Sequence, residues 1–321
     1  MKKSLHTFCF LLLLPLMGFA EDAPSIRVGA LAFGTLAWEL AAIERTARGT
    51  QPSLKISTQV LSSPEAGRIA LQGNSTDLIV TDWIFVAQQR LKGQDYTFVP
   101  FSSLSGALVV PKDSPIRDLS DLRAKRIGVA GGGLDKNWLL LKRVAQKEKG
   151  LDLEKDAEIQ FGAPPLLSET LKRGQLDAVL TYWNHAVRLE QLGYRILARG
   201  SDLQTLLGLQ SEIPTLGYVF RDSWAKAHPE ALNLFLRRAR DARESLCDSD
   251  KTWASIEAAV GESDQKTREA LRTAYCRGGT HRMGPREIEE ASTLFEALSN
   301  PKVSETDFWN GVFHQAGRPD S

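Results

Sequence analysis

Cysteine and histidine are scarce in this sequence, and this scarcity argues against several kinds of catalytic centre. Three cysteines and five histidines are spread over 321 residues, and the histidines do not cluster. A zinc site needs about four such ligands at short spacing, and a thiol nucleophile needs a base beside it. No glycine-rich nucleotide loop and no Ser-His-Asp set stands out. We therefore expect no metal, no cofactor and no catalytic activity.

An excess of charge of either sign is also missing. The chain has 40 lysines and arginines against 39 aspartates and glutamates, a formal net charge of +1. Removal of the N-terminal signal described next takes away two basic residues, so the mature balance is 38 − 39 = −1. A nearly neutral protein has no general attraction for nucleic acids or anionic lipids. We therefore expect no nucleic acid partner, and we expect a monomer.

Long apolar runs are missing except at the N-terminus. Two lysines precede an apolar run from Phe8 to Leu16, and small residues follow up to Ala20. This order is typical of a cleaved secretory signal over residues 1–20. The run is too short to span a bilayer, and no cysteine follows it where a lipid could be attached. We expect a free protein in the periplasm; an N-terminal membrane anchor is the alternative.

Cleavage of the signal removes Cys9 and leaves one pair of cysteines, Cys247 and Cys276. The compartment is oxidising, so we predict a disulfide between them. The bond would stabilise the fold by roughly 3–4 kcal/mol if it acts by restricting the unfolded chain. Two separate buried thiols are the alternative.

A weak internal repeat, with a period near 100 residues, is the most informative feature of the chain. Arg27–Ala30 followed by Gly34 corresponds to Arg126–Val129 followed by Gly133, at an offset of 126 − 27 = 99. Each segment predicts a short buried strand that ends in a glycine turn. Helices are expected after the two turns, over 35–48 and 135–148.

The second half of each unit repeats as well. Four residues recur at an offset of 183 − 83 = 100: Leu71, Asp77, Thr81 and Trp83 match Leu171, Asp177, Thr181 and Trp183. In both copies a helix is followed by a glycine, an apolar strand and a Thr-x-Trp exit. Alternating helices and strands predict two α/β lobes with parallel sheets. Ligands bind beyond the carboxyl ends of such strands, so both lobes would present their strand exits to one cleft. The alternative is a chance likeness, because α/β units resemble each other.

The remainder of the chain is mostly helical. Thr215–Phe220 reads as a strand that returns the chain to the first lobe. We therefore expect residues 21–110 in the first lobe, 111–200 in the second, and 201–321 back in the first lobe with C-terminal helices. The crossings between lobes are expected at Val109–Pro111 and after Leu197.

The middle of the chain resembles a known family. The run Ala107–Ile116, followed by Leu119–Leu122 and Lys125–Val129, is similar to ABC-transporter solute-binding proteins, in the branch that binds nitrate, sulfonates, taurine and thiamine precursors. The resemblance implies a two-lobed type 2 periplasmic binding fold, with parallel or mixed sheets flanked by helices. It also implies a receptor that closes on a small solute and docks on an ABC permease. The turn from Gly131 to Asp135 departs from the serine- and threonine-rich turn of many relatives.

Backbone groups at the glycine turns are the first candidates for ligand binding. Gly34 and Thr35, and Gly132, Gly133 and Asp135, start helices whose free N–H groups attract polar or anionic groups. The alternative is that the turns need glycine only for their backbone angles. Asp135 would itself cap its helix and, like Asp82, adds negative charge, so a simple nitrate or sulfate site is disfavoured.

Aromatic and polar side chains at the strand exits are the second group of candidates. They are Phe33, Thr81, Trp83, Tyr182, Trp183 and Asn184. Aromatic faces stack on flat rings and attract cations, whereas core packing is the alternative for each of them. The repeat places Trp83 and Trp183 equivalently, so they are the strongest pair of ligand-binding candidates. Lys136 and Arg188 are the basic candidates, and the alternative for each is an ordinary position on the solvated surface. We expect an organic ligand with a flat or apolar part.

Two other functions remain open at this point. The thiamine-precursor relatives include a pyrimidine synthase that depends on a cysteine-rich motif and a histidine, and this chain has no such cluster. A periplasmic sensory or accessory protein of the same fold is the other possibility, because a fold does not determine a function.

Overall fold

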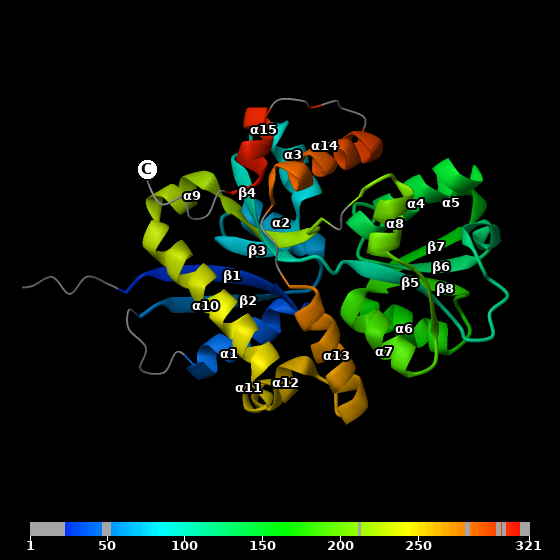
Figure 1. Cartoon of the computed structure of the whole chain (residues 1–321), viewed down its shortest axis with the longest axis horizontal. Helices are drawn as coiled ribbons and strands as arrows, with labels where there is room; N and C mark the ends of the chain where they lie inside the picture. Colours follow the sequence, from blue (N-terminus) through cyan, green and yellow to red (C-terminus); the bar gives the residue numbers. More distant parts are fainter. Residues whose placement is uncertain are drawn as a thin grey trace, which may run out of the picture.

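The computed structural model describes residues 23–46, 53–210, 213–279, 283–299, 303 and 306–314, so the expected signal lies outside the described residues. Figure 1 shows two lobes side by side, each built on one five-stranded sheet with helices around it. None of the described helices is both long enough and apolar enough to cross a bilayer.

The elements follow one another in three stretches. The first lobe begins with β1 (Ser25–Leu31), α1 (Leu36–Thr46), β2 (Lys55–Leu61), α2 (Pro64–Gln72), β3 (Leu78–Asp82), α3 (Trp83–Arg90) and β4 (Tyr96–Ser102). The second lobe contains β5 (Gly106–Val110), the 3-10 helix η1 (Leu119–Leu122), β6 (Arg126–Ala130), α4 (Lys136–Lys149), α5 (Leu153–Asp156), β7 (Glu158–Gly162), α6 (Pro164–Lys172), β8 (Ala178–Tyr182), α7 (Trp183–Gln191), β9 (Arg195–Arg199) and α8 (Gly200–Leu206). The chain returns with β10 (Leu216–Arg221), α9 (Asp222–Ala227), α10 (Pro229–Asp248), α11 (Asp250–Ser255), α12 (Glu257–Val260), α13 (Gln265–Arg277), α14 (Pro285–Ser299) and α15 (Thr306–Val312).

The two sheets have the same topology. Their strand orders are β2-β1-β3-β10-β4 and β7-β6-β8-β5-β9. In each sheet the strand that arrives from the other lobe, β10 or β5, is antiparallel to both of its neighbours. The pairs α2/α6 and β3/β8 are both offset by 100 residues (164 − 64 and 178 − 78). The expected α/β architecture with mixed sheets is therefore confirmed, and the sequence repeat corresponds to duplicated structure.

One expected crossing between the lobes is wrong. Val109 lies inside β5, where it pairs with Val179 and Ile196, so Val109 and Val110 belong to the second sheet and Pro111 directly follows it. The chain crosses earlier, over Ser103–Ser105, between β4 and β5. The apolar run that starts at Ala107 is a fully buried strand with neighbours on both sides, which an exposed hinge segment could not be.

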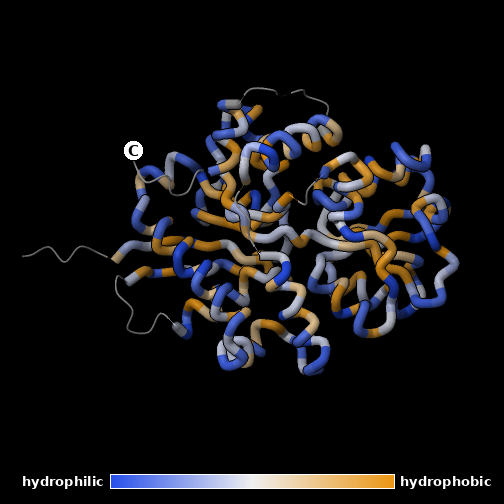
Figure 2. Tube along the Cα trace, viewed as in Figure 1, coloured by the Kyte–Doolittle hydropathy of each residue, from blue (hydrophilic) through white to orange (hydrophobic). Residues whose placement is uncertain are grey.

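Local signals in the sequence explain where the helices next to the cleft begin. Ser63 Oγ accepts a hydrogen bond from the backbone N–H of Ala66 at 3.1 Å and thereby caps α2. Asp82 caps α3 in the same way through the N–H of Phe85, and Asp135 caps α4 through the N–H of Asn137, each at 2.8 Å. Because these caps sit at the carboxyl ends of strands, helix starts gather at one edge of each sheet. Figure 2 shows apolar segments running through the middle of both lobes.

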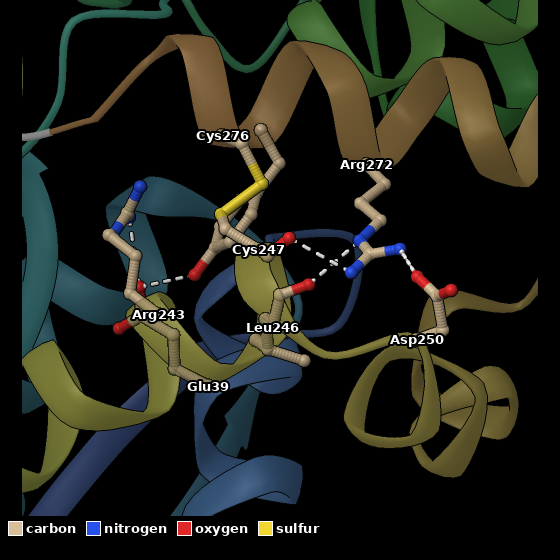
Figure 3. The surroundings of a disulfide bond; sticks show 8 residues. Glu39, Arg243, Leu246, Cys247, Asp250, Arg272 and Cys276 are labelled. Atoms are coloured by element: carbon tan, nitrogen blue, oxygen red, sulfur yellow. Dashed lines mark hydrogen bonds and ion pairs between the residues drawn. A yellow bond between two sulfur atoms is a disulfide. The ribbon is translucent and has the colours of Figure 1, made fainter.

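The structure contains the predicted disulfide, which joins the end of α10 to α13 (Figure 3). The Cα atoms of Cys247 and Cys276 are 5.7 Å apart. Next to it, Arg272 of α13 donates to the backbone carbonyls of Leu246 and Cys247, both at 2.9 Å. The disulfide and this arginine together hold α13 against the end of α10.

A buried carboxylate lies close to the disulfide. Glu39 of α1 is fully buried and pairs with Arg243 at 2.9 Å (Figure 3), and it accepts hydrogen bonds from the hydroxyls of Tyr218 (2.5 Å) and Tyr275 (2.7 Å). Burial, together with the Glu39 charge, raises the pKa of both tyrosines, so they remain neutral donors. The cluster satisfies a buried charge with partners from β10, α10 and α13.

Candidate ligand-binding site

A cavity of about 690 Å³, counting the open space at its mouth, lies between the two lobes, and about 70 Å³ of it is accessible to the centres of water molecules. Its lining comes from the ends of β1, β3 and β4, from α2, and from the starts of α4 and α7. Nine of the residues considered from the sequence line it: Gly34, Thr35, Thr81, Asp82, Asp135, Lys136, Tyr182, Trp183 and Asn184. The strand exits of both halves therefore meet in one place, as the duplicated topology requires.

Trp83 is a correction to the prediction, because it does not line the cavity. Its side chain is fully buried in the first lobe, with ring centroids 6.2 Å from Trp309 and 6.1 Å from Phe313. The C-terminal helix α15 covers α3 at this point, so the Trp83 indole belongs to the hydrophobic core of the first lobe. Trp183 starts the equivalent helix of the second lobe but faces the first lobe, with its ring 5.7 Å from that of Trp38.

Three further predicted residues lie around the cavity without lining it. Phe33 lines two neighbouring hollows at the mouth. Gly132 lies across from the first lobe, where a Cβ would meet Glu65 Oε1 at 2.9 Å. Gly133 is exposed beside Phe161. The glycine turn of the second lobe thus forms the rim, and only Asp135 at its end reaches the cavity.

Arg68 is a cavity residue that the sequence reasoning missed. Its Nη2 lies 2.8 Å from Asp82 Oδ2, and both side chains are nearly buried. Since the other oxygen of Asp82 caps α3, the negative charge of Asp82 is fully engaged. Arg68 lies three residues before Leu71 and four after Pro64, on the buried face of α2. An arginine at a helix position that faces the core is unusual, and this position in the sequence could have indicated that Arg68 is a buried functional residue.

Asp135 and Lys136 are neighbouring charges in the same lining. Asp135 is buried, and desolvation raises the pKa of its carboxyl, which the nearby Lys136 charge partly opposes. Lys136 is only 5% exposed, and its ammonium forms no hydrogen bond or ion pair within the described residues. The ammonium is therefore available to a ligand in the cavity, which favours a molecule that brings a negative group to Lys136.

Aromatic and neutral groups complete the lining. Trp183 and Phe101 provide apolar faces. Burial, with the charge of Asp135, raises the pKa of Tyr182, which keeps its hydroxyl neutral as a donor. The Asn184 amide donates to the backbone carbonyl of Phe33 at 3.1 Å and so joins the lobes at the cavity wall. The arrangement can bind a molecule with an anionic end, a hydrogen-bond donor for Asp135 and a flat or apolar part.

Comparison with known proteins agrees with this architecture. Residues 75–249 match the family described as NMT1/THI5 like, which is more than half of the chain. The chain belongs to the NMT1/THI5-like family. The resemblance inferred from the sequence is thereby confirmed, and residues 250–314 lie beyond the matched region.

Solved structures show the same fold. The alkanesulfonate-binding protein SsuA from Xanthomonas axonopodis pv. citri, bound to MOPS, is 20% identical, with a TM-score of 0.67 over 87% of this chain and 94% of that one. The periplasmic aliphatic sulphonate-binding protein SsuA from Escherichia coli is 20% identical, with a TM-score of 0.65 over 91% and 92%. The ligand-binding component of an ABC-type import system from Staphylococcus aureus, with zinc bound, is 14% identical, with a TM-score of 0.67 over 89% and 95%. No curated protein sequence matches the chain significantly.

Proposed function

We propose that the protein is the periplasmic solute-binding component of an ABC-type uptake system and that its two lobes close on a small organic solute. The observation that carries this proposal is the cavity between the lobes, lined by buried polar and charged side chains from both halves. Hinged closure of two lobes around a ligand is a common use of this arrangement. In this role the closed form docks on an inner-membrane permease.

The charges of the cavity favour a particular ligand chemistry. Lys136 is free to pair with an anionic group, whereas Arg68 already pairs with Asp82. Asp135 can accept a hydrogen bond from an amine or amide of the ligand. Trp183 offers a face for a flat or apolar portion. A ligand with both an anionic and a donor group meets all three, whereas nitrate or sulfate would leave Asp135 facing an anion.

A catalytic role receives less support from the same lining. Among the described residues that line the cavity there is no cysteine and no histidine, the usual groups for nucleophilic and acid–base work. We therefore propose binding without turnover. A non-transport receptor of the same fold would use the same cavity, and it differs only in the partner of the closed form.

A ligand panel tests the proposal. The probes are alkanesulfonates including MOPS, aminosulfonates, inorganic nitrate and sulfate, and aminopyrimidines related to thiamine, each measured by thermal shift and then by calorimetry. A ligand present at one hundred times its Kd stabilises the folded chain by about 2.7 kcal/mol. We expect the largest shift from compounds with both an anionic and a donor group. No shift from any class would overturn the proposal.

Lys136→Met provides the matched variant. We expect at least about tenfold weaker binding of the responding compound, because one charge-assisted contact is lost. Lys142→Met, on the same helix, removes a lysine that pairs with Glu154 at 2.7 Å on the exposed side, and it should bind as the wild type. Equal affinity in the Lys136→Met variant would contradict the assigned role of the cavity.

A further inference from the structure

Helix α7 is one of the elements through which the second lobe contacts the first, and its main neighbour there is α13. Its first residue, Trp183, packs edge-on against Trp38, and its second, Asn184, donates to the carbonyl of Phe33. Both contacts lie at the cavity wall. The next turn of the helix carries a third contact, made by Arg188.

Arg188 makes three contacts with one guanidinium group, one within α7 and two with the segment that contains Val260 and Glu262. Its Nη2 donates to the carbonyl of Val260 at 2.7 Å, and its Nε lies 3.3 Å from Glu262 Oε2. Its Nη1 donates to the carbonyl of Asn184 at 3.0 Å. The side chains of Arg188 and Glu262 are only 21% and 19% exposed, so water screens this ion pair weakly. Salt therefore screens this contact less than an ordinary surface pair, although burial lowers the pKa of Arg188 by desolvating its charge.

Its partners belong to the C-terminal segment that follows the family match. Val260 ends the short helix α12, and Gly261 after it has a left-handed φ of 64°. A carbonyl at the end of a helix has no partner within the helix, and Arg188 supplies one for Val260. Helix α12 packs on α1 of the first lobe, so this arginine connects the second lobe to the first through the C-terminal segment.

We propose that Arg188 is a positioning residue that holds the two lobes closed, and that its clasp on Val260 and Glu262 sets how much of the ligand-free protein is closed. Arg188 does not line the cavity that Lys136 and Trp183 line; it lines the neighbouring hollow at the mouth. A contact that exists only in the closed form raises the population of that form, and thereby the apparent affinity, without touching the ligand. The inference rests on the proposed hinge-closing function.

The test compares ligand-free full-length variants, so it does not depend on knowing the solute. In Arg188→Ala we expect a larger radius of gyration in solution scattering than in the wild type. Hydrogen exchange of residues 256–262 should become faster by about tenfold, since a charge-assisted interlobe contact is lost. Glu262→Gln should change both readouts in the same direction and by less, because the Val260 contact remains.

Arg199→Ala is the matched control. Arg199 also forms an ion pair at 3.3 Å, but its partner is Glu190 at the end of α7, so the pair lies within the second lobe. This variant should keep the wild-type radius of gyration. If Arg188→Ala does not fold by circular dichroism, Glu262→Gln carries the test alone. Unchanged scattering and exchange in a folded clasp variant, or equal changes in Arg199→Ala, would overturn the clasp. If no compound of the ligand panel shifts the melting temperature, by contrast, that result counts against the proposed function only.

Discussion

The helices α3 and α7 follow equivalent strands and begin with the same residue, yet they lie in opposite environments. The first reads Trp83-Ile84-Phe85 and is covered by α15, with all three side chains buried in the first lobe. The second reads Trp183-Asn184-His185 and faces the other lobe across the cavity. The duplicated halves therefore share a backbone plan, whereas the cover placed on each helix decides whether its first turn is core or binding site.

The largest expected difference between the two helices is the loss of folding stability when the first tryptophan of each is removed. Trp83→Ala should lower the free energy of unfolding by about 3–5 kcal/mol, because a fully buried indole leaves a cavity behind. Urea unfolding measures the loss. Trp183→Ala should cost clearly less stability but should weaken the responding panel ligand by at least about tenfold, if stacking contributes about 1.4 kcal/mol or more. Equal losses of stability in both variants would erase the distinction between the helices.

The second prediction concerns what covers α7. Its neighbour is α13, which the disulfide ties to α10. The double variant Cys247→Ser/Cys276→Ser should lose roughly 3–4 kcal/mol of unfolding free energy, chiefly because the unfolded chain gains freedom. Urea titration of the variant, and of the wild type with and without a reducing agent, gives the value. A reductant that lowers the stability of the double variant as much as that of the wild type would contradict the assignment.

The third prediction concerns His185 of α7, which occupies the position that Phe85 occupies in α3. Burial, and then the nearby Arg188 charge, lower the pKa of His185 to about 4. Above its ordinary pKa of 6.5 the imidazole is neutral in the folded and the unfolded chain, so its ionisation does not change the free energy of unfolding. As the pH falls from about 6.5 to about 4, only the unfolded chain takes up the proton, and the folded state loses stability.

The His185→Gln variant isolates that loss. At pH 7.5 the ionisation of His185 contributes nothing to the free energy of unfolding. The difference in that free energy between the variant and the wild type at pH 7.5 is therefore the baseline. At pH 4.5 the variant should gain about 1–2 kcal/mol relative to that baseline, a value reduced for the partial solvent exposure of the ring. Parallel urea curves at both pH values measure it. A difference that is the same at both pH values would show that His185 titrates normally in the folded protein.

The same comparison shows what the sequence could predict. The repeat located the strand exits, and helix caps at Ser63, Asp82 and Asp135 are local signals that the folded chain uses. Trp83 was misplaced because its cover, Trp309 and Phe313, comes from the far end of the chain. No local pattern announces such a neighbour. After the tryptophan, α7 continues with the polar residues Asn184 and His185, whereas α3 continues with the apolar residues Ile84 and Phe85. This difference in polarity indicated which of the two helices faces the cleft.

Arg68 was missed for a different physical reason. Strand exits are placed by the sheet, so residues such as Tyr182 could be assigned to the cavity from topology alone. Arg68 reaches the same place from the side of a helix, through the length of its own side chain. Its partner Asp82 could not be inferred from spacing, because the pair depends on how α2 lies against β3.

The smallest expected effect concerns a feature that the halves have kept. At the start of each unit an arginine donates from its backbone N–H and its guanidinium to the aspartate that precedes a neighbouring strand of the sheet, β3 or β8: Arg27 to Asp77, and Arg126 to Asp177. Asp77 is 8% exposed, whereas Asp177 is 31% exposed. Removing an arginine therefore leaves a more poorly hydrated carboxylate in the first lobe than in the second.

Arg27→Ala should accordingly lower the free energy of unfolding by about 1 kcal/mol, near the upper end for an ion pair that is open to solvent on one side. Arg126→Ala should have a smaller effect, because Asp177 stays hydrated. Salt sharpens the contrast, since 0.5 M sodium chloride should screen the exposed pair more than the half-buried one (the Debye length is about 10 Å at 0.1 M and shorter at higher salt). If Arg126→Ala is the more damaging change, burial of the carboxylate does not set the strength of this repeated contact.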